Sequence, residues 1–312
     1  MSKDSRIEWT HHTFNPWWGC TKVSAGCKHC YAETWARRLG KDFWGAKAER
    51  RELSPAYWKQ PASWNSLAKS ERKRARVFCA SMADVFEDRR DLDDRRARLW
   101  QVIVDTPHLD WLLLTKRPEN VSKLAPWKDD WPSNIWLGAT AENQRWLDKR
   151  MPFLTSTGAK TLFLSCEPLL GPIDLTSWLQ AAELGRARQI DWVIGGGESG
   201  HQSRPMNPEW VRGLRDQCVT GGIRFHFKQW GNWKPLLPRG LEKGATKTLF
   251  LSSGDRITVV NVGKKEAGRL LDGRRWDEFP DGSKQKQASQ RRGGSSPGQG
   301  SANDLQLRYS TE

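Results

Sequence analysis

Short apolar runs that alternate with longer amphipathic segments constrain the fold of this chain more than any other feature. Each run is too short for a buried helix and is rich in β-branched, aromatic or leucine residues. The six runs are residues 76–80, 111–114, 135–138, 161–164, 192–194 and 223–227. Continuous apolar runs of this length are typical of strands buried on both faces of a parallel sheet.

The segments between these runs have the spacing of helices. Residues 91–105 place Leu92, Leu99, Val102 and Ile103 on or near one helical face. Residues 143–153 and 208–218 are similar, and Asn207 is a suitable N-cap for the second. Strand and helix alternate six times after an N-terminal segment with room for one more strand, which predicts a β/α barrel or a doubly wound sheet.

Polar and charged residues gather where the predicted strands end. The segments are 81–87, 115–120, 139–144, 165–170, 195–200 and 228–233, and they contain acids, amides, Ser, Thr and Lys. Ligands of α/β proteins bind at the carboxyl ends of the strands, so we expect these segments to converge on one site. Residues 195–200 match a dinucleotide-binding glycine pattern, but Pro205 and Pro208 argue against a helix that begins at its last glycine.

The pattern changes after about residue 236, and we predict three parts. Residues 1–235 form the β/α barrel. Residues 236–280 hold a small β extension, with a hairpin of residues 248–251 and 256–262, a short helix over 264–271 and coil over 276–280. Residues 281–312 are rich in Gly, Ser, Gln, Lys and Arg and are expected to be disordered.

The charge of the chain favours a polyanionic partner. The 51 Lys and Arg residues exceed the 36 Asp and Glu residues by 15, which suits nucleic acid, although a basic balance also serves solubility alone. Residues 69–76 are strongly basic and follow Trp44, Trp58 and Trp64. Such a combination can bind single-stranded nucleic acid, but a solvated helix face with the tryptophans in the core is the favoured interpretation.

Neither a membrane segment nor a secretory leader is predicted. The sequence has no apolar run of about 18 residues, and its first residues lack the apolar core of a signal peptide. We therefore expect a cytoplasmic protein without a membrane partner. Its six cysteines should be reduced there, which favours metal binding or catalysis over disulfides.

Three cysteines form the strongest local motif, Cys20, Cys27 and Cys30, with the spacing C-x6-C-x2-C. Thiolates this close repel one another unless a cation or cluster neutralises them. A [4Fe–4S] cluster held by three cysteines leaves one iron open. A closed zinc site needs a fourth ligand, for which His11, His12 and His29 are candidates. Unligated thiols are the third alternative.

The other three cysteines stand apart in the sequence. Cys79 lies in a predicted strand and Cys218 at a helix end, so both are expected in the core. Cys166 follows a predicted strand, where it either faces the site or packs in the core.

The segment NPWWGCTKVSAGCKHCYAE (residues 15–33) resembles a three-cysteine family often carried by phages and bacteria, itself similar to the radical-SAM superfamily. The segments MADVFE, LLTKRPEN, SCEPLLGPIDL, GGESG and FKQWG also resemble that family. The resemblance covers roughly residues 5–280 and implies a partial or complete parallel β/α TIM-like barrel of the radical-SAM type. The chain departs from the common C-x3-C-x2-C spacing, and its Gly-Gly-Glu falls late, at residues 196–198.

The resemblance implies a [4Fe–4S] cluster on Cys20, Cys27 and Cys30, with S-adenosylmethionine at the open iron. It also implies a low-potential electron donor of the flavodoxin or ferredoxin type. A nucleic acid or nucleotide is the candidate substrate class. The candidate cofactor-binding residues are Ser81, Asp84, Thr115, Lys116, Glu142, Asn143, Glu167, Gly196, Gly197, Glu198, Lys228 and Gln229.

Two other functions remain open at this point. One is a zinc-stabilised nucleic-acid-binding protein without redox chemistry. The other is a metal-free β/α-barrel hydrolase that uses the strand-end carboxylates. The hydrolase ranks last, because the sequence contains no nucleophile elbow and no His–acid pair with telling spacing.

Overall fold

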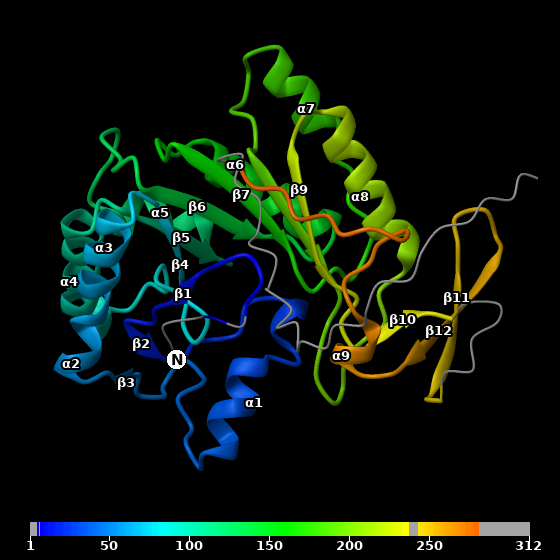
Figure 1. The fold of residues 1–312 in the computed structure, drawn as a ribbon, viewed down its shortest axis with the longest axis horizontal. Helices are drawn as coiled ribbons and strands as arrows, with labels where there is room; N and C mark the ends of the chain where they lie inside the picture. The colour runs from blue at the N-terminus through cyan, green and yellow to red at the C-terminus, as the bar shows by residue number, and fades with distance from the viewer. Residues whose placement is uncertain (1–4, 6, 237–242, 281–312) are drawn as a thin grey trace, which may run out of the picture.

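A curled, seven-stranded parallel sheet forms the body of the molecule (Figure 1). The computed structural model describes residue 5 and residues 7–236 and 243–280. The strand order is β1-β4-β5-β6-β7-β8-β9, and every neighbouring pair is parallel. The sheet is curled, and its edge strands β1 and β9 do not pair with each other in the described residues, so it forms a half-barrel and not a closed barrel. The strands are β1 (His12–Thr13), β4 (Ala75–Cys79), β5 (Leu109–Thr115), β6 (Ile135–Thr140), β7 (Thr161–Cys166), β8 (Trp192–Gly196) and β9 (Arg224–Gln229).

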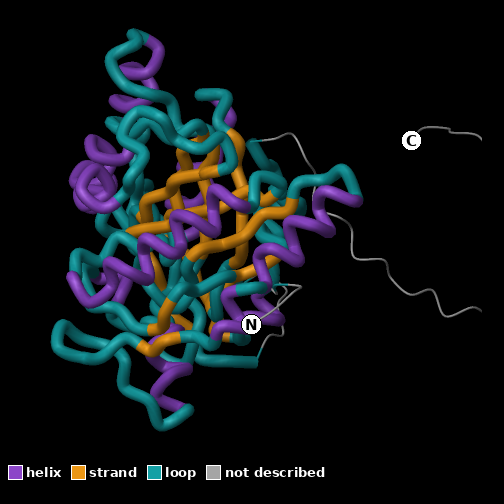
Figure 2. The backbone as a smooth tube through the Cα atoms, turned by 90° about the vertical axis from the view of Figure 1, so that its left-hand side faces the viewer, coloured by secondary structure: helices purple, strands orange, loops and turns teal. Residues whose placement is uncertain are grey.

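All six apolar runs form strands of this sheet, so the predicted α/β class and parallel sheet are confirmed. The seventh strand, β1, comes from the N-terminal segment, as expected. The helices are α1 (Tyr31–Arg38), α2 (Pro55–Trp58), α3 (Gln60–Ser70), α4 (Asp93–Asp105), α5 (Val121–Leu124), α6 (Gln144–Thr155), α7 (Thr176–Glu183), α8 (Pro208–Thr220) and α9 (Lys264–Ala267). Figure 2 shows helices lying against the curved layer of strands.

Side-chain hydrogen bonds fix the start of two of the predicted helices. The Asn207 side chain accepts a hydrogen bond from the Glu209 amide at 3.0 Å and caps α8, as predicted. Asn143 caps α6 in the same way by accepting from the Trp146 amide at 3.3 Å. Each cap satisfies an amide that has no partner within its own helix.

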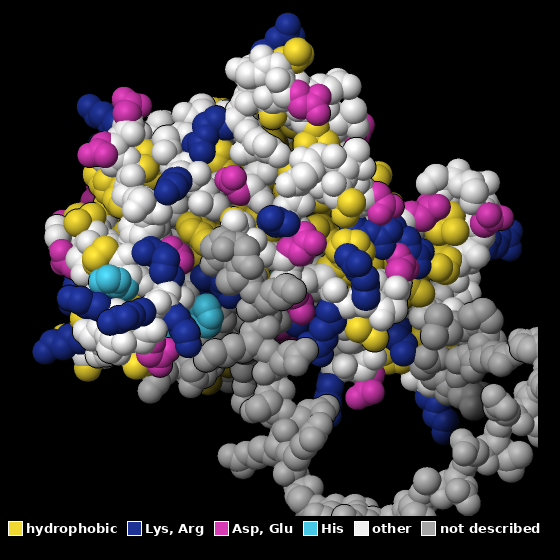
Figure 3. Space-filling model, turned by 45° about the horizontal axis from the view of Figure 1, so that its top comes forward, with side chains coloured by type: hydrophobic (Ala, Val, Ile, Leu, Met, Phe, Trp, Pro, Cys, Tyr) yellow, Lys and Arg dark blue, Asp and Glu magenta, His cyan; other side chains and the backbone are white. Residues whose placement is uncertain are grey.

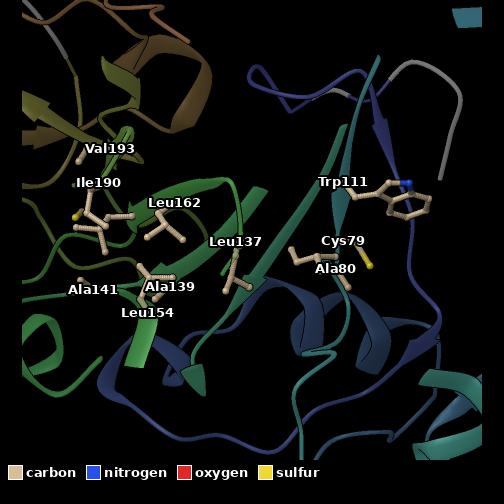
Figure 4. Close-up of a cluster of buried hydrophobic side chains, with 14 of the residues drawn as sticks. Cys79, Ala80, Trp111, Leu137, Ala139, Ala141, Leu154, Leu162, Ile190 and Val193 are labelled. Atoms are coloured by element: carbon tan, nitrogen blue, oxygen red, sulfur yellow. The ribbon is translucent and has the colours of Figure 1, made fainter. Parts of the chain in front are cut away.

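The two faces of the sheet carry separate cores, because successive residues of a strand point to opposite faces. The larger core packs the sheet against its helices and includes Leu137, Leu162 and Val193 (Figure 4). A smaller, aromatic core fills the other face and includes Phe163 and Trp192. Trp9 and Phe279, from opposite ends of the described chain, pack into this smaller core.

Cys166 belongs to the larger core and is fully buried there, together with Cys79 and Cys218. Of the two alternatives that the sequence left open for Cys166, packing in the core is therefore the one that the structure shows. It shares the face of Leu162 and Leu164, two and four residues earlier in β7, and this face packs against the helices.

The three tryptophans that precede the basic residues 69–76 also lie in the interior. Trp58 and Trp64 are buried in the larger core, and Trp44 is buried in a third cluster beside Trp18 and Ala36. These rings are not available for base stacking, so the favoured interpretation of residues 69–76, a solvated face with tryptophans in the core, agrees with the structure.

The C-terminal extension contains three strands where the sequence suggested two. The predicted hairpin forms as β11 (Thr246–Phe250) and β12 (Arg256–Asn261), and β10 (Trp233–Pro235) pairs with the other edge of β12. The predicted helix over 264–271 is shorter, because α9 ends at Ala267 before Gly268, which has a positive φ of 72°. This sheet lies beside β9 and α9 (Figure 1). The predicted disordered tail, 281–312, lies outside the described residues.

In the described part of the chain, no helix combines the length and the apolar character needed to cross a bilayer.

On the face shown in Figure 3, Lys and Arg side chains are interspersed with Asp and Glu side chains. Two further short strands, β2 (Trp17–Trp18) and β3 (Arg51–Glu52), pair with each other and frame the cysteine segment.

Candidate functional site

The three motif cysteines lie on one loop, which runs from β2 to α1. Cys20 follows β2, Cys27 ends a single 3₁₀ turn (Ala25–Cys27), and Cys30 occupies the N-cap position of α1. All three side chains are half-buried. The cysteine loop, defined here as residues 19–31, therefore lies at the surface with its cysteines only partly exposed.

Polar contacts attach the cysteine loop to the carboxyl ends of several strands of the large sheet. Arg117, which follows β5, donates to the Thr21 carbonyl at 2.5 Å, and one of its nitrogens lies 3.6 Å from the Cys20 sulfur. The Tyr31 hydroxyl donates to the Ser81 carbonyl beyond β4 at 2.9 Å. The loop thus covers the end of the half-barrel at which α/β proteins bind their ligands.

The attachment continues beyond β6 and β8. Ser24 donates a hydrogen bond to Glu142, and its hydroxyl lies 3.7 Å from the Cys27 sulfur. Gly26 packs directly on Glu142, since a Cβ atom there would lie 2.5 Å from Oε1 of that carboxylate. Arg204 donates to the Ala25 carbonyl at 3.0 Å.

Glu142 is fully buried and ionised. Arg150 donates to it at 2.7 Å, with both side chains out of contact with solvent. Burial by itself would raise the pKa of Glu142, but Lys116, Arg150 and the Ser24 hydroxyl together lower it. The carboxylate therefore serves as a fixed anionic anchor for the loop.

Asp84 is the centre of a second buried network. It accepts hydrogen bonds from the Thr115 hydroxyl at 2.7 Å, the Lys116 amide at 3.1 Å and the Arg117 guanidinium at 2.8 Å. Arg50 links this region to the loop, because it pairs with Glu87 at 2.8 Å and donates to the Thr21 hydroxyl at 3.0 Å. The hydrogen bonds of Asp84 and Thr115 to each other and to Arg117 hold the Arg117 side chain in place.

Two thiols of the loop, those of Cys20 and Cys30, are largely desolvated. Burial and, after it, the carboxylate of Asp84 raise the pKa of Cys20 to about 12, although Arg117 acts in the opposite direction. Burial also raises the pKa of Cys30. A metal or cluster that binds here would have to displace thiol protons, because the thiolate is the ligand.

Two lysines and one glutamate lie beneath the loop on the inner face of the half-barrel. Lys228 of β9 pairs with Glu167 beyond β7 at 2.8 Å, and Lys116 beyond β5 donates to the Thr140 hydroxyl at 3.1 Å. The positive charge of Lys116 opposes the rise in the pKa of Cys30 that burial causes. This inner group combines two cations with one anion next to the cysteine loop.

The remaining predicted residues have diverse surroundings. Ser81 lies 3.2 Å from the Asn15 amide nitrogen, and Glu198 accepts from Arg204 at 2.8 Å. Gly197 lies so close to the backbone that a Cβ atom would be 2.0 Å from the Trp230 carbonyl oxygen, while one on Gly196 would be 3.2 Å from Glu167 Cγ. Gln229 is buried, and its side-chain oxygen has no hydrogen-bond partner within the described segments.

Four arginines and a serine that support the site were not among the predicted residues. They are Arg50, Arg117, Arg150, Arg204 and Ser24. Arg117 stands next to Lys116 in the polar strand-end segment 115–120, so its position carried a usable signal. The others lie on helices and loops, where an arginine or serine has no distinctive pattern.

No group of three or more His, Cys, Asp or Glu side chains within the described residues is arranged to hold a single metal ion. His11 and His12 do not approach the loop: the ring of His11 accepts from the Arg76 amide at 2.8 Å, and that of His12 stacks on Trp64 at 4.4 Å. Each cysteine of a [4Fe–4S] cluster binds a different iron, so such a cluster suits thiols spread along one loop. The cysteine loop fits this group on its donor set and its place at the strand ends.

Comparison with known proteins identifies a family. A family model described as "Protein of unknown function (DUF5131)" matches residues 4–280. No curated protein sequence matches the chain. One solved structure with weak similarity is that of the radical S-adenosylmethionine methyltransferase TsrM from Kitasatospora setae, with tryptophan substrate and a SAM analog (aza-SAM) bound. The identity is 12% and the TM-score 0.30, over 82% of this chain and 49% of that one. The chain thus spans about half the length of that enzyme.

Proposed function

The chain belongs to the DUF5131 family, and we propose that it is a radical-SAM-type enzyme whose cysteine loop holds a [4Fe–4S] cluster. The observation that carries the proposal is the attachment of a three-cysteine loop to the carboxyl ends of β4, β5, β6 and β8. Thiols at this end of a β/α half-barrel lie where the fold class binds its ligands.

Cys20, Cys27 and Cys30 would each bind one iron and leave the fourth open for S-adenosylmethionine. When bound, cluster and cofactor would supply one-electron chemistry that begins with cleavage of a carbon–sulfur bond. An electron donor of the flavodoxin or ferredoxin type is part of this proposal.

The inner group supplies charges that suit S-adenosylmethionine. Lys116 and Lys228 would bind its carboxylate, and Glu167 would bind its ammonium group, because charge-assisted hydrogen bonds are the strong ones. The unpaired side-chain oxygen of Gln229 would accept a hydrogen bond from the nucleoside. Gly196 and Gly197 would act indirectly, because their lack of a side chain lets the strand end pack closely against Glu167 and the Trp230 backbone.

Other predicted residues act indirectly in this proposal. Asp84 and Thr115 position Arg117, and Glu142 positions the loop through Ser24. Asn143 caps α6, Glu198 fixes Arg204, and Ser81 lies at the rim with Asn15. Nucleic acid or a nucleotide remains the proposed substrate class.

The test is anaerobic purification followed by iron and sulfide analysis and electron paramagnetic resonance of the reduced protein. We expect about four irons per chain, and a spectrum that changes when S-adenosylmethionine is added. Cys20→Ala, Cys27→Ala and Cys30→Ala should each abolish the cluster, whereas the core variant Cys218→Ala should retain it. Stoichiometric zinc in a protein that takes up no cluster would overturn the proposal and favour the zinc-binding alternative.

A further inference from the structure

Helix α1 exposes an unusual set of large side chains directly after the cysteine loop. Tyr31 and Trp35 lie one turn apart, about 6 Å along the helix axis, and Leu39 follows after another turn. Their exposed fractions are 57%, 40% and 50%. Several large apolar side chains together at a surface indicate a binding site more often than chance exposure.

The two rings are held in place by the protein. The Tyr31 hydroxyl is hydrogen-bonded to the Ser81 carbonyl. The Trp35 ring packs edge-on against the buried Trp18, with centroids 5.0 Å apart and planes at 67°. The Arg51 guanidinium covers Trp18, 4.2 Å from its centroid. Both rings are therefore preorganised, which reduces the entropy lost when a ligand stacks on them.

Basic residues outnumber acids in and next to α1, where Asp42 is the one exposed acid within residues 28–45. Lys28, Arg38 and Lys41 are exposed, and none of them has an acidic partner within salt-bridge distance in the described parts of the chain. The one acid of the helix, Glu33, is buried and is already paired with Lys22 at 2.6 Å and Arg37 at 2.9 Å. The surface next to the rings therefore keeps a net positive charge, unlike the mixed face in Figure 3.

We propose that this surface, the α1 platform (Tyr31, Trp35 and Leu39 with Lys28, Arg38 and Lys41), binds single-stranded nucleic acid. Bases stack on the two aromatic rings, and phosphates pair with the three cations, which is the combination that such ligands require. Helix α1 begins one residue after Cys30, so a bound strand lies beside the candidate site. The binding does not need a cluster, and in this respect the inference goes beyond the proposed function.

The test uses fluorescence anisotropy with a fluorescein-labelled oligothymidine of about 16 nucleotides and the full chain. Trp35→Leu keeps an apolar contact with Trp18 but removes the ring, and should weaken binding about tenfold. The double variant Arg38→Gln/Lys41→Gln should lower the slope of log affinity against log salt by about 1.4, since each phosphate contact on a single strand contributes about 0.7. A charge-matched control, Lys69→Gln/Lys73→Gln, changes two exposed lysines in or near α3.

The platform is supported if Trp35→Leu and Arg38→Gln/Lys41→Gln weaken binding and the control variant binds like the wild type. It is overturned if Lys69→Gln/Lys73→Gln loses as much affinity for the oligonucleotide as Arg38→Gln/Lys41→Gln, because binding then follows net charge alone. It is also overturned if Trp35→Leu binds the oligonucleotide like the wild type. The same holds if the wild type does not bind the oligonucleotide and binds a flavodoxin-type protein at this surface instead. Iron content, measured on the same preparations, separates the two proposals: a protein that binds oligothymidine but takes up no iron contradicts only the enzyme function.

Discussion

The guanidinium of Arg117 lies 3.6 Å from the sulfur of Cys20, although 97 residues separate them in the sequence. The nitrogen that approaches the sulfur also donates to Asp84 at 2.8 Å, and the second terminal nitrogen donates to the Thr21 carbonyl. One side chain thus joins the cysteine loop to the ends of β4 and β5. Removing this side chain should lower the stability of the protein and also the amount of iron that the cysteine loop binds.

Arg117→Ala should lower the free energy of unfolding by about 3–5 kcal/mol, because it leaves the buried carboxylate of Asp84 without its charged partner. Arg117→Lys should recover only part of this loss, since an ammonium group cannot reproduce the planar, forked contacts. Urea unfolding followed by circular dichroism measures both variants. The exposed pair of Lys123 and Asp88 provides the control, and Lys123→Ala should cost less than about 1 kcal/mol. Equal losses in the two alanine variants would contradict a structural role for Arg117.

Gly26→Ala should disturb the cysteine loop without changing its charge. The new Cβ atom would lie 2.5 Å from Oε1 of Glu142, so the loop or the carboxylate must move, at a cost of about 1–3 kcal/mol. We expect lower stability and fewer irons after reconstitution, measured by denaturation and by iron analysis. Gly213→Ala is the matched control, because Gly213 lies within α8 with no atom within 4 Å of a new Cβ. This second change should stabilise the protein by about 0.5–1 kcal/mol.

His226 should make the folded protein sensitive to acid. Its ring is fully buried beside Trp192 and Phe279, and burial lowers its pKa well below the usual value, helped by the charges of Arg269, Lys228 and Arg76. The folded state therefore keeps the ring neutral, while the unfolded state takes up a proton below about pH 6.5. Above that pH, the contribution of His226 to the free energy of unfolding should be constant. As the pH drops below it, the free energy of unfolding should decrease by up to about 1.4 kcal/mol per pH unit.

Chemical denaturation at several pH values measures this slope, and His226→Phe should reduce it. The Asp277 carboxylate faces the same ring at 3.8 Å and opposes the effect. If the variant and the wild type lose stability in parallel between pH 6.5 and pH 5, His226 is not the responsible group.

Thiol labelling should separate the six cysteines into two classes. In the native, metal-free protein, a maleimide should modify no more than Cys20, Cys27 and Cys30, which are half-buried. The other three are fully buried, and burial raises the pKa of each thiol, which suppresses the reactive thiolate. Mass spectrometry should show at most three labels before unfolding and six after it. A label on Cys166 in the folded protein would contradict its assignment to the core.

The sequence predicted the strands of the large sheet well, because strands buried on both faces need continuous apolar runs whatever the rest of the chain does. It predicted the cap of α8 at Asn207 but not the cap of α6 at Asn143, whose predicted contact with the cofactor stays a prediction. An asparagine at a strand end is compatible with either role. The cap became visible only in the structure, where the Trp146 amide lies 3.3 Å from the Asn143 side-chain oxygen.

The alternation of apolar runs and amphipathic segments, the polar strand ends and the cysteine spacing by themselves determined the parallel α/β fold and the location of the candidate site. These features are local, since each follows from the period of a helix or strand or from residues close in sequence. Tertiary structure alone decided which strand-end side chains face the site and which satisfy one another. Asp84 meets Arg117 across 33 residues, and Ser24 meets Glu142 across 118. Such pairs form because a buried charge needs a partner, and which partner comes within reach depends on how the sheet curls and where the cysteine loop comes to lie.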